Sequence, residues 1–287
     1  MLISGAGVAG PALAYWLLEA GMIPVLLDAA PRPRTGGYMI DFWGLGFEVA
    51  EKMGLADRLR NVGYKIEHLT IVDARGRTQI SLGVGAITRV LGDRYVSLQR
   101  GDLAATLFEN VKDRVETIFG DEAVSLSEAD RGVLVSFRRR AERRFDLVVG
   151  ADGLHSNIRR LAFTGSFETP LGYHFAAFTA DTYPHRDERA YVSRTTVARQ
   201  AARYGLRGGR TAFFMIVGTQ LARGRSLATP EEQRAFLADA FADIGWESRD
   251  LIAALDRSDD LYFDTASQVR MPGWSNGRVA LVGDAAY

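Results

Sequence analysis

Leu2-Ile3-Ser4-Gly5-Ala6-Gly7-Val8-Ala9-Gly10 stands directly after the first methionine and decides the fold. A short apolar strand leads into three glycines, and residues 11–20 follow with the composition of a helix that Gly21 ends. Residues 23–27 are a continuous apolar run, which is typical of a strand covered on both faces in a parallel sheet. The first 28 residues therefore predict a strand–helix–strand unit.

The three glycines have the spacing of a dinucleotide-binding turn. Gly5 permits the tight turn, Gly7 lets the backbone approach a pyrophosphate, and Gly10 lets the helix pack close to the strand. The N-terminus of the helix then offers free N–H groups to phosphates. Asp28 ends the second strand, and its separation from Gly10 along the sequence is about what this fingerprint requires. At the end of that strand it can accept hydrogen bonds from a ribose diol. The alternative is a structural glycine turn with Asp28 in solvent.

Two later segments end in the same way. Leu147-Val148-Val149 leads into Gly150-Ala151-Asp152-Gly153, and Val279-Ala280-Leu281-Val282 leads into Gly283-Asp284. Ligands of open α/β sheets bind at the carboxyl ends of the strands. One such strand end can be a simple turn, whereas three on one sheet predict a nucleotide site.

The middle of the chain has a different sequence pattern from these strand–turn segments. Residues 31–46 are rich in Pro, Arg and Gly and predict a loop, and residues 47–59 predict a helix. Apolar and polar residues alternate over 66–73, and residues 78–82 return after a turn, which predicts a β-hairpin with one face open to solvent. Helices are also expected over 101–110 and 230–245, the second with Thr229 as N-cap, and strands over 133–137, 145–149, 174–179, 189–197 and 211–217.

These segments predict an α/β fold with an inserted α+β part. A Rossmann-like, nucleotide-binding βαβ domain is interleaved with a mostly antiparallel β-sheet domain that would bind substrate. The first domain is expected from residues 1–60, 99–164 and 271–287, and the second from residues 61–98 and 165–270.

Composition excludes several classes of protein. The 287 residues include no cysteine, which excludes disulfides, zinc fingers, iron–sulfur clusters and dithiol redox centres, and the four histidines lack metal-ligand spacing. Basic and acidic residues number 35 each, which argues against nucleic-acid or anionic-membrane partners. No apolar run reaches the roughly 18 residues of a membrane span, and no signal peptide is recognisable. We expect a cytoplasmic monomer or homodimer without a metal site.

With these motifs in place, the sequence resembles a group A flavoprotein monooxygenase of the para-hydroxybenzoate hydroxylase fold. The resemblance covers essentially the whole chain, and its segment 34–41 is similar to the branch of Tet(X)-like tetracycline-inactivating and polyketide-tailoring hydroxylases. The motifs that carry it, in family order, are the GxGxxG turn, the Arg-Gly-Asp-Leu helix start at 100–103, a DG motif (Asp152, Gly153, Ser156, Arg159) and a GD motif (Gly283, Asp284).

The resemblance implies FAD as the cofactor. Asp28 would hold the adenosine ribose, Arg100 would contact the diphosphate–ribityl region, and Asp284 would hold the ribityl chain or the pyrophosphate. The cofactor-binding residues expected in this way are Gly5, Gly7, Val8, Ala9, Gly10, Asp28, Arg34, Gly37, Asp41, Arg100, Leu103, Asp152, Gly153, Gly283 and Asp284.

The resemblance also implies NADPH or NADH as a transient reductant. Asp152 and Gly153 would serve both FAD and this nucleotide, and Arg34 and Asp41 would lie near the flavin or NADPH. The reduced flavin would react with O2, and the resulting flavin C4a-hydroperoxide would hydroxylate an aromatic or polyketide-like small molecule. Because the cofactor carries this chemistry, no catalytic side chain is expected to stand out. Candidates for the apolar wall of the substrate pocket are Tyr173, Phe175, Phe178, Phe213, Phe214 and Met215.

Two features depart from the family pattern. Ala29 stands where the family usually has an arginine after the acid of the second strand, so one contact on the adenine side would be missing or supplied elsewhere, for instance by Arg32. Family members continue beyond the GD motif into a loop and a long helix, so the FAD-binding domain is expected to lack its C-terminal part. The arginine-rich segment 138–144 is interpreted as a solvated hairpin turn, with steering of NADPH phosphate as the alternative.

Other functions stay open at this point. A flavin reductase or dehydrogenase of the same fold would share all three nucleotide motifs. A halogenase is disfavoured because no WxWxIP-like segment occurs. A catalytically impaired FAD-binding fragment, or a flavin-free binding protein, would fit Ala29 and the missing C-terminal segment.

Overall fold

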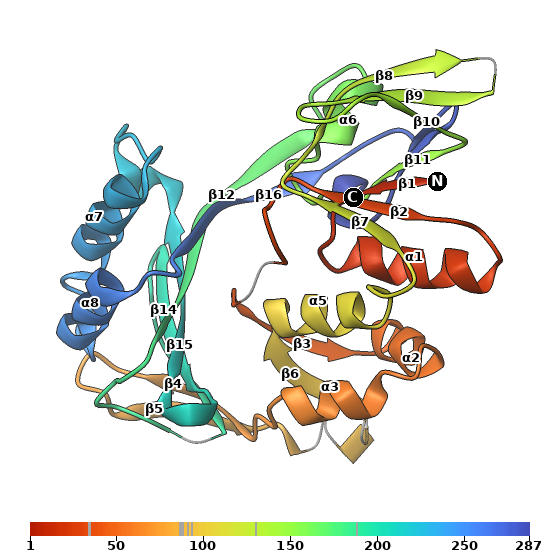
Figure 1. Ribbon diagram of the computed structural model, residues 1–287. Coiled ribbons are helices and arrows are strands. Elements are labelled where there is room, and N and C mark those ends of the chain that lie inside the picture. The colour runs from red at the N-terminus through yellow and green to blue at the C-terminus, as the bar shows by residue number, and fades with distance from the viewer. Residues whose placement is uncertain (34–35, 86–88, 91, 93, 130, 188) are drawn as a thin grey trace. The chain divides into compact units, whose positions relative to one another are not determined.

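The computed structural model describes residues 1–33, 36–85, 89–90, 92, 94–129, 131–187 and 189–287. The chain forms two compact units, each assembled from separated segments (Figure 1). Unit 1 comprises residues 1–35, 101–169 and 267–287, and unit 2 comprises residues 36–100 and 170–266. The expected interleaving of two sheets in an α/β fold is confirmed.

Unit 1 is built on a six-stranded sheet of order β17-β18-β11-β1-β2-β7. All neighbouring pairs are parallel except β17–β18. The strands are β1 (Leu2–Ser4), β2 (Val25–Asp28), β7 (Glu116–Phe119), β11 (Val148–Gly150), β17 (Ser275–Asn276) and β18 (Val279–Leu281). The continuous apolar runs predicted this arrangement, because a parallel strand buries both faces.

The two faces of this sheet have different covers, as Figure 1 shows. Ile3 and Leu26 pack with Ala14 of α1, whereas Leu2 and Leu27 pack towards a three-stranded sheet of order β10-β9-β8. The remaining elements are α1 (Ala9–Glu19), α5 (Arg100–Glu109, whose first residue belongs to unit 2), β8 (Ala123–Ala129), β9 (Gly132–Phe137), β10 (Arg143–Phe145), α6 (Asn157–Ala162) and the short 3-10 helix η3 (Gly283–Ala285).

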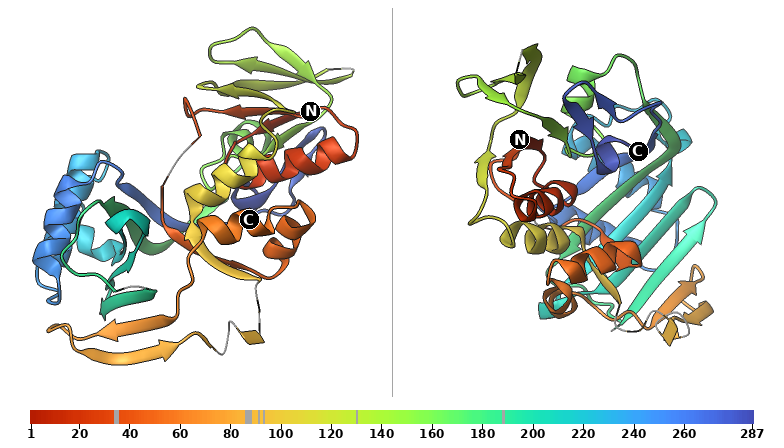
Figure 2. Two further views of the ribbon diagram at one scale, coloured as in Figure 1. Left: turned by 60° about the horizontal axis from the view of Figure 1, so that its bottom comes forward. Right: turned by 90° about the vertical axis from the view of Figure 1, so that its right-hand side faces the viewer.

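Unit 2 is built on a seven-stranded sheet of order β16-β12-β15-β14-β13-β4-β5, whose strands run side by side in Figure 2. The pairs β12–β15, β15–β14, β14–β13 and β4–β5 are antiparallel, and β13 pairs with β4 in parallel. The strands are β4 (His68–Val72), β5 (Thr78–Gly83), β12 (Glu168–Ala180), β13 (Ala190–Thr196), β14 (Arg199–Gly205), β15 (Thr211–Gly218) and β16 (Tyr262–Val269). Residues 168–169 of β12 and 267–269 of β16 belong to unit 1.

Two helices, α7 (Pro230–Phe241) and α8 (Ser248–Arg257), cover one face of this sheet (Figure 1). Phe213 and Met215 of β15 are buried against Phe236 and Phe241 of α7, which forms the core of unit 2. The expected N-cap at Thr229 is confirmed, because its side chain accepts the N–H of Glu232 in a capping box. The 3-10 helix η1 (Arg207–Gly209) connects β14 with β15, and the 3-10 helix η2 (Thr219–Ala222) lies between β15 and α7.

Residues 36–60 lie in unit 2, so the domain boundary expected after residue 60 needs correction. The reason is a pairing between distant segments, in which β3 (Met39–Trp43) runs antiparallel to β6 (Tyr95–Gln99). The N–H of Met39 also donates to the hydroxyl of Tyr204 at 3.0 Å. The helix expected over 47–59 is divided into α2 (Leu45–Lys52) and α3 (Ala56–Val62) near Gly54, whose φ is +72°.

Candidate functional site

The three glycine-containing strand ends meet at one edge of the parallel sheet of unit 1. The N–H of Gly5 donates to Leu27 O at 2.6 Å, the N–H of Ala151 to Ser4 O at 2.7 Å, and the N–H of Val282 to Gly150 O at 2.9 Å. These hydrogen bonds connect residues at the carboxyl ends of β1, β2, β11 and β18. The edge is therefore where a nucleotide ligand of this fold is expected.

Glycine is required at two positions of the GxGxxG turn. Gly5 has a φ of +110°, and a Cβ there would overlap the carbonyl of Ala151. A Cβ on Gly10 would overlap the carbonyl oxygen of Gly5. The turn thus brings the start of α1 against β1. Val8 at the N-cap gives no side-chain hydrogen bond and the first turn carries no acid, so the N–H groups there suit a pyrophosphate.

The GD turn lies beside the start of α1. Gly283 has a φ of +60°, and a Cβ there would be 3.1 Å from the Cβ of Ala9. Asp284 follows with an exposed side chain. Unit 1 therefore brings Gly283 next to the glycine-rich turn, and the exposed carboxylate of Asp284 follows it directly.

Asp28 has the geometry of a ribose acceptor. Its half-buried carboxylate accepts the N–H of Ala6 at Oδ2 (2.7 Å) and the N–H of Ala30 at Oδ1 (2.8 Å). These two bonds fix the orientation of the carboxylate. Each oxygen of a carboxylate can accept two hydrogen bonds, so capacity is left for the two hydroxyls of a ribose.

Asp121 is a residue of this edge that the sequence interpretation missed. Its side chain is 1% exposed, follows β7, and accepts the N–H of Arg139 at 3.0 Å, while Arg140 Nε lies 3.6 Å from it. The N–H of Asp121 donates to Asp28 O at 3.3 Å. Asp121 therefore holds the arginine-rich segment 138–144 next to Asp28. The available signal was a fourth short run of strand-forming residues, 117–119, that is followed by Gly120 and Asp121.

The DG motif has a mainly internal role in unit 1. The Asp152 carboxylate accepts the Ser156 hydroxyl and the N–H groups of Asn157 (2.9 Å) and Ile158 (3.0 Å), so it caps α6. Arg159 is buried, which lowers the pKa of its guanidinium, and it donates to Ala285 O at 3.0 Å. Arg159 thus ties the DG motif to the GD turn. Direct contact of Asp152 and Gly153 with a nucleotide stays a prediction.

A cavity of about 390 Å³ lies within unit 2. Its polar group is Asp41, whose Oδ1 accepts the hydroxyls of Tyr95 (2.8 Å) and Ser97 (2.5 Å). Burial and the neighbouring Asp41 raise the pKa of Tyr95 to about 12, so its phenol stays a neutral donor near pH 7. The apolar wall is formed by Ile66, Leu69, Val84, Tyr191, Tyr204 and Phe214.

The six residues expected in the substrate pocket are divided between the two faces of the sheet. Phe214 lines the cavity. Phe175 joins a ring cluster on the same side of the sheet and lies 5.7 Å, between centroids, from both Tyr38 and Tyr262. Tyr173 is exposed. The other three, Phe178, Phe213 and Met215, are core residues under the helices rather than pocket lining, because strand alternation turns them to the opposite face.

The remaining predicted cofactor residues lie around the start of α5, apart from Arg34, which is outside the described residues. The N–H of Arg100 donates to Tyr38 O at 2.9 Å. Gly37 has a φ of +93°, and a Cβ there would be 3.9 Å from the Cβ of Arg100. Leu103 is 2% exposed, so its side chain is part of the protein interior.

Comparison with known proteins identifies the family. A family model described as "FAD binding domain" matches residues 1–287. The chain belongs to this FAD-binding family. It is 33% identical to a flavin-dependent monooxygenase of Legionella longbeachae, over 100% of this chain and 74% of that protein. As a member of the family with such relatives, it is an FAD-dependent monooxygenase, which acts with O2 on a small molecule.

Solved structures agree with this assignment. The tetracycline destructase Tet(51) matches 100% of this chain with 74% of its own, at a TM-score of 0.86 and 32% identity. Klebsiella pneumoniae HpxO complexed with FAD and uric acid matches 99% of this chain with 72% of its own, at a TM-score of 0.80. Its identity of 23% shows a common fold alone. Among the residues that the structure describes, no helix combines the length and hydropathy needed to cross a membrane.

Proposed function

We propose that this FAD-binding family member uses NADPH or NADH and O2 to hydroxylate an aromatic or polyketide-like small molecule in the cavity of unit 2. The observation that carries the proposal is the composition of that cavity, in which rings and aliphatic side chains lie beside one exposed carboxylate, that of Asp41. Its volume of about 390 Å³ is within the range of pockets for small organic ligands. The similarity to Tet(51), a tetracycline destructase, supports a polycyclic substrate.

The residues of unit 1 suit FAD and would hold its adenosine and diphosphate parts. Asp28 would accept the ribose hydroxyls, and the open N-terminus of α1 would bind the diphosphate. Bound FAD would supply the redox chemistry and the activation of O2, with the nicotinamide nucleotide as the source of electrons. The protein side of the reaction is then to bind, orient and shield the substrate.

Asp41 would act on the substrate. Both of its hydrogen bonds from described residues, those of Tyr95 and Ser97, go to Oδ1, which leaves Oδ2 for an acidic hydroxyl of a phenol or enol. Accepting that proton would make the ring more electron-rich and easier to hydroxylate. The family resemblance implies a place for Asp41 near the flavin or NADPH, and one variant distinguishes a role in cofactor binding from a role at the substrate.

The test is Asp41→Asn, with Asp57→Asn, which changes an exposed carboxylate of α3, as a matched control. If Asp41 serves the substrate, the substitution lowers kcat at least about tenfold and leaves the Kd for FAD unchanged. If FAD binding weakens instead, Asp41 serves the cofactor. A panel of phenolic and polycyclic compounds is then assayed for stimulation of NADPH oxidation by the unaltered protein. The hydroxylase proposal fails if none of them stimulates it.

Two further properties stay predictions from the sequence. A monomer or homodimer is expected, which size-exclusion chromatography with light scattering tests. A cytoplasmic location is expected, which cell fractionation tests.

A further inference from the structure

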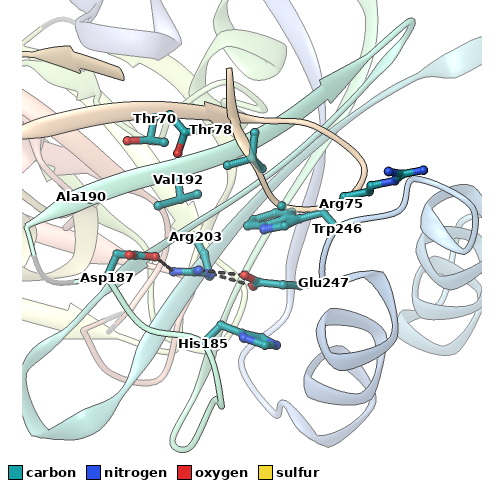
Figure 3. A pocket seen from close by; sticks show the side chains of 12 residues that line it. Thr70, Arg75, Thr78, His185, Asp187, Ala190, Val192, Arg203, Trp246 and Glu247 are labelled. Atoms are coloured by element: carbon teal, nitrogen blue, oxygen red, sulfur yellow. Dashed lines mark hydrogen bonds and ion pairs between the residues drawn. The ribbon is translucent and has the colours of Figure 1, made fainter. Parts of the chain in front are cut away.

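A second cavity, of about 440 Å³, lies in unit 2 on the opposite face of the large sheet. Strand alternation separates the two cavities. Tyr191 and Tyr204 line the proposed substrate cavity, whereas their neighbours Val192 and Arg203 line the second one. We call the second cavity the Trp246 cleft, after the side chain at its centre in Figure 3. It has residues in common with neither the proposed substrate cavity nor the nucleotide edge.

Arg203 is a buried cation that faces this cleft. Its side chain is 5% exposed, and its Nε and Nη2 donate to the two oxygens of Glu247 at 2.7 and 2.8 Å. The hydroxyl of Tyr183 donates to the same carboxylate at 2.9 Å. Burial alone would lower the pKa of Arg203, but the carboxylates beside it raise the pKa overall. The Arg203–Glu247 pair is thus a fixed, charged part of the cleft.

The third nitrogen of the guanidinium has a different partner. Arg203 Nη1 lies 2.9 Å from the carboxylate of Asp187, whose side chain is 52% exposed, whereas that of Glu247 is 10% exposed. Asp187 belongs to the connection between β12 and β13 rather than to a strand or helix. Because Asp187 is half-exposed and Glu247 keeps its two hydrogen bonds to Arg203, another carboxylate can take the place of Asp187 at Nη1 without leaving the buried charge unpaired.

Trp246 is held in the cleft by a strained backbone. Its φ is +53°, which is unusual for a tryptophan, and its N–H donates to Ala74 O at 2.6 Å. A Cβ on the preceding Gly245 would be 2.7 Å from the Cβ of Ala74. The indole ring lies 5.5 Å from the guanidinium carbon of Arg203. Strain of this kind persists where the surroundings fix a side chain in a particular place.

The rim of the cleft carries further basic side chains. Arg75 is exposed on the β4–β5 turn, and His185 lies on the other side of the Arg203–Glu247 pair from Trp246 in Figure 3. His185 Nε2 is 2.9 Å from Asp250. A ligand that enters the cleft therefore meets an aromatic ring, a buried guanidinium that is paired with two carboxylates, and the exposed Arg75 at the rim.

We propose that the Trp246 cleft is a second binding site, for a small aromatic carboxylate. The carboxylate of the ligand replaces Asp187 at Nη1 of Arg203, and its ring packs beside the indole of Trp246. A carboxylate is the class of anion that matches a guanidinium, and it is the group that occupies this position in the structure. An aromatic ring matches the half-buried indole of Trp246.

The test uses benzoate as the probe and 19F NMR of protein labelled with 5-fluorotryptophan. The chain has four tryptophans, of which Trp246 lines this cleft and Trp43 lines the proposed substrate cavity. Single Trp→Phe variants assign the two resonances. We expect benzoate to shift the Trp246 resonance in a saturable way, and the neutral analogue benzyl alcohol to leave it unshifted. A benzoate response confined to Trp43, or no response, overturns the proposal.

A substitution at Asp187 gives a second and sharper test of the proposed benzoate site. Asp187→Ala removes the competing carboxylate, so benzoate should bind about fivefold or more tightly, in line with a hydrogen bond to a charged group. The matched control is Asp243→Ala, which removes an exposed carboxylate paired with Arg199 on the same strand as Arg203. That variant should leave the Kd of benzoate unchanged. Equal affinities of the Asp187→Ala variant and the unaltered protein, or a matching increase in the control, overturn the proposal.

Discussion

Asp28→Ala is the sharpest test of FAD binding at the edge of the parallel sheet of unit 1. The carboxylate that the substitution removes is oriented by the N–H groups of Ala6 and Ala30, at 2.7 and 2.8 Å, towards the position expected for a ribose diol. Two hydrogen bonds between the ribose hydroxyls and a carboxylate, each worth about 1–1.5 kcal/mol at a half-buried site, sum to about 2–3 kcal/mol. We therefore expect the Kd for FAD to rise by a factor of about 30–150.

The assay is fluorescence titration of the apoprotein with FAD, with FMN as the matched ligand. FMN has no adenosine ribose, so the Asp28→Ala variant should bind it as the unaltered protein does. Thermal melting of both apoproteins checks that the turn around Ala6 is still folded. The reasoning is refuted if the Kd for FAD stays within twofold of the original, or if FMN binding weakens by the same factor.

Three other predictions follow from the described side chains. Phe213→Ala should lower the free energy of unfolding by about 3–5 kcal/mol in urea titrations, because Phe213 is in the core, whereas Phe214→Ala should mainly raise the KM for substrate. Arg140→Gln should weaken FAD binding several-fold, because Arg140 is the cation beside the buried Asp121, whereas Arg144→Gln, from the far strand of the same hairpin, should not. Burial and Asp41 raise the pKa of Tyr95 from about 10 to about 12. The protonated phenol therefore contributes stability that is fully present below pH 10 and is lost as the pH rises from 10 to 12. In melting experiments at a series of pH values, Tyr95→Phe should reduce that loss.

The nucleotide edge could be predicted because its signals are local. The sequence 2–10 contains a strand, the glycines that a close turn needs, and the start of a helix, all within one segment. Asp28, Asp152 and Asp284 each follow an apolar run, and parallel strands bring such positions to one edge. The structure adds what spacing could not show, namely that the Asp152 carboxylate is already engaged with the start of α6.

The substrate side could be predicted only in part, because its signals are long-range. Alternation along β15 places Phe213 and Phe214 on opposite faces, but it does not say which face α7 and α8 cover. The cavity also depends on Asp41, Tyr95 and Tyr204, which come from three strands that are distant in sequence. The pairing of β3 with β6 moves residues 36–60 into unit 2, and no local pattern announces that pairing.

The most direct measurement of the central claim is the fate of oxygen during turnover. The protein is loaded with FAD and supplied with NADPH, a compound that stimulates NADPH oxidation, and 18O2, and the product is analysed by mass spectrometry. The account predicts a product heavier by one 18O atom, with NADPH consumed only at the basal rate when the compound is left out. NADPH oxidation that yields an unlabelled product, with all of the label in hydrogen peroxide or water, would contradict it.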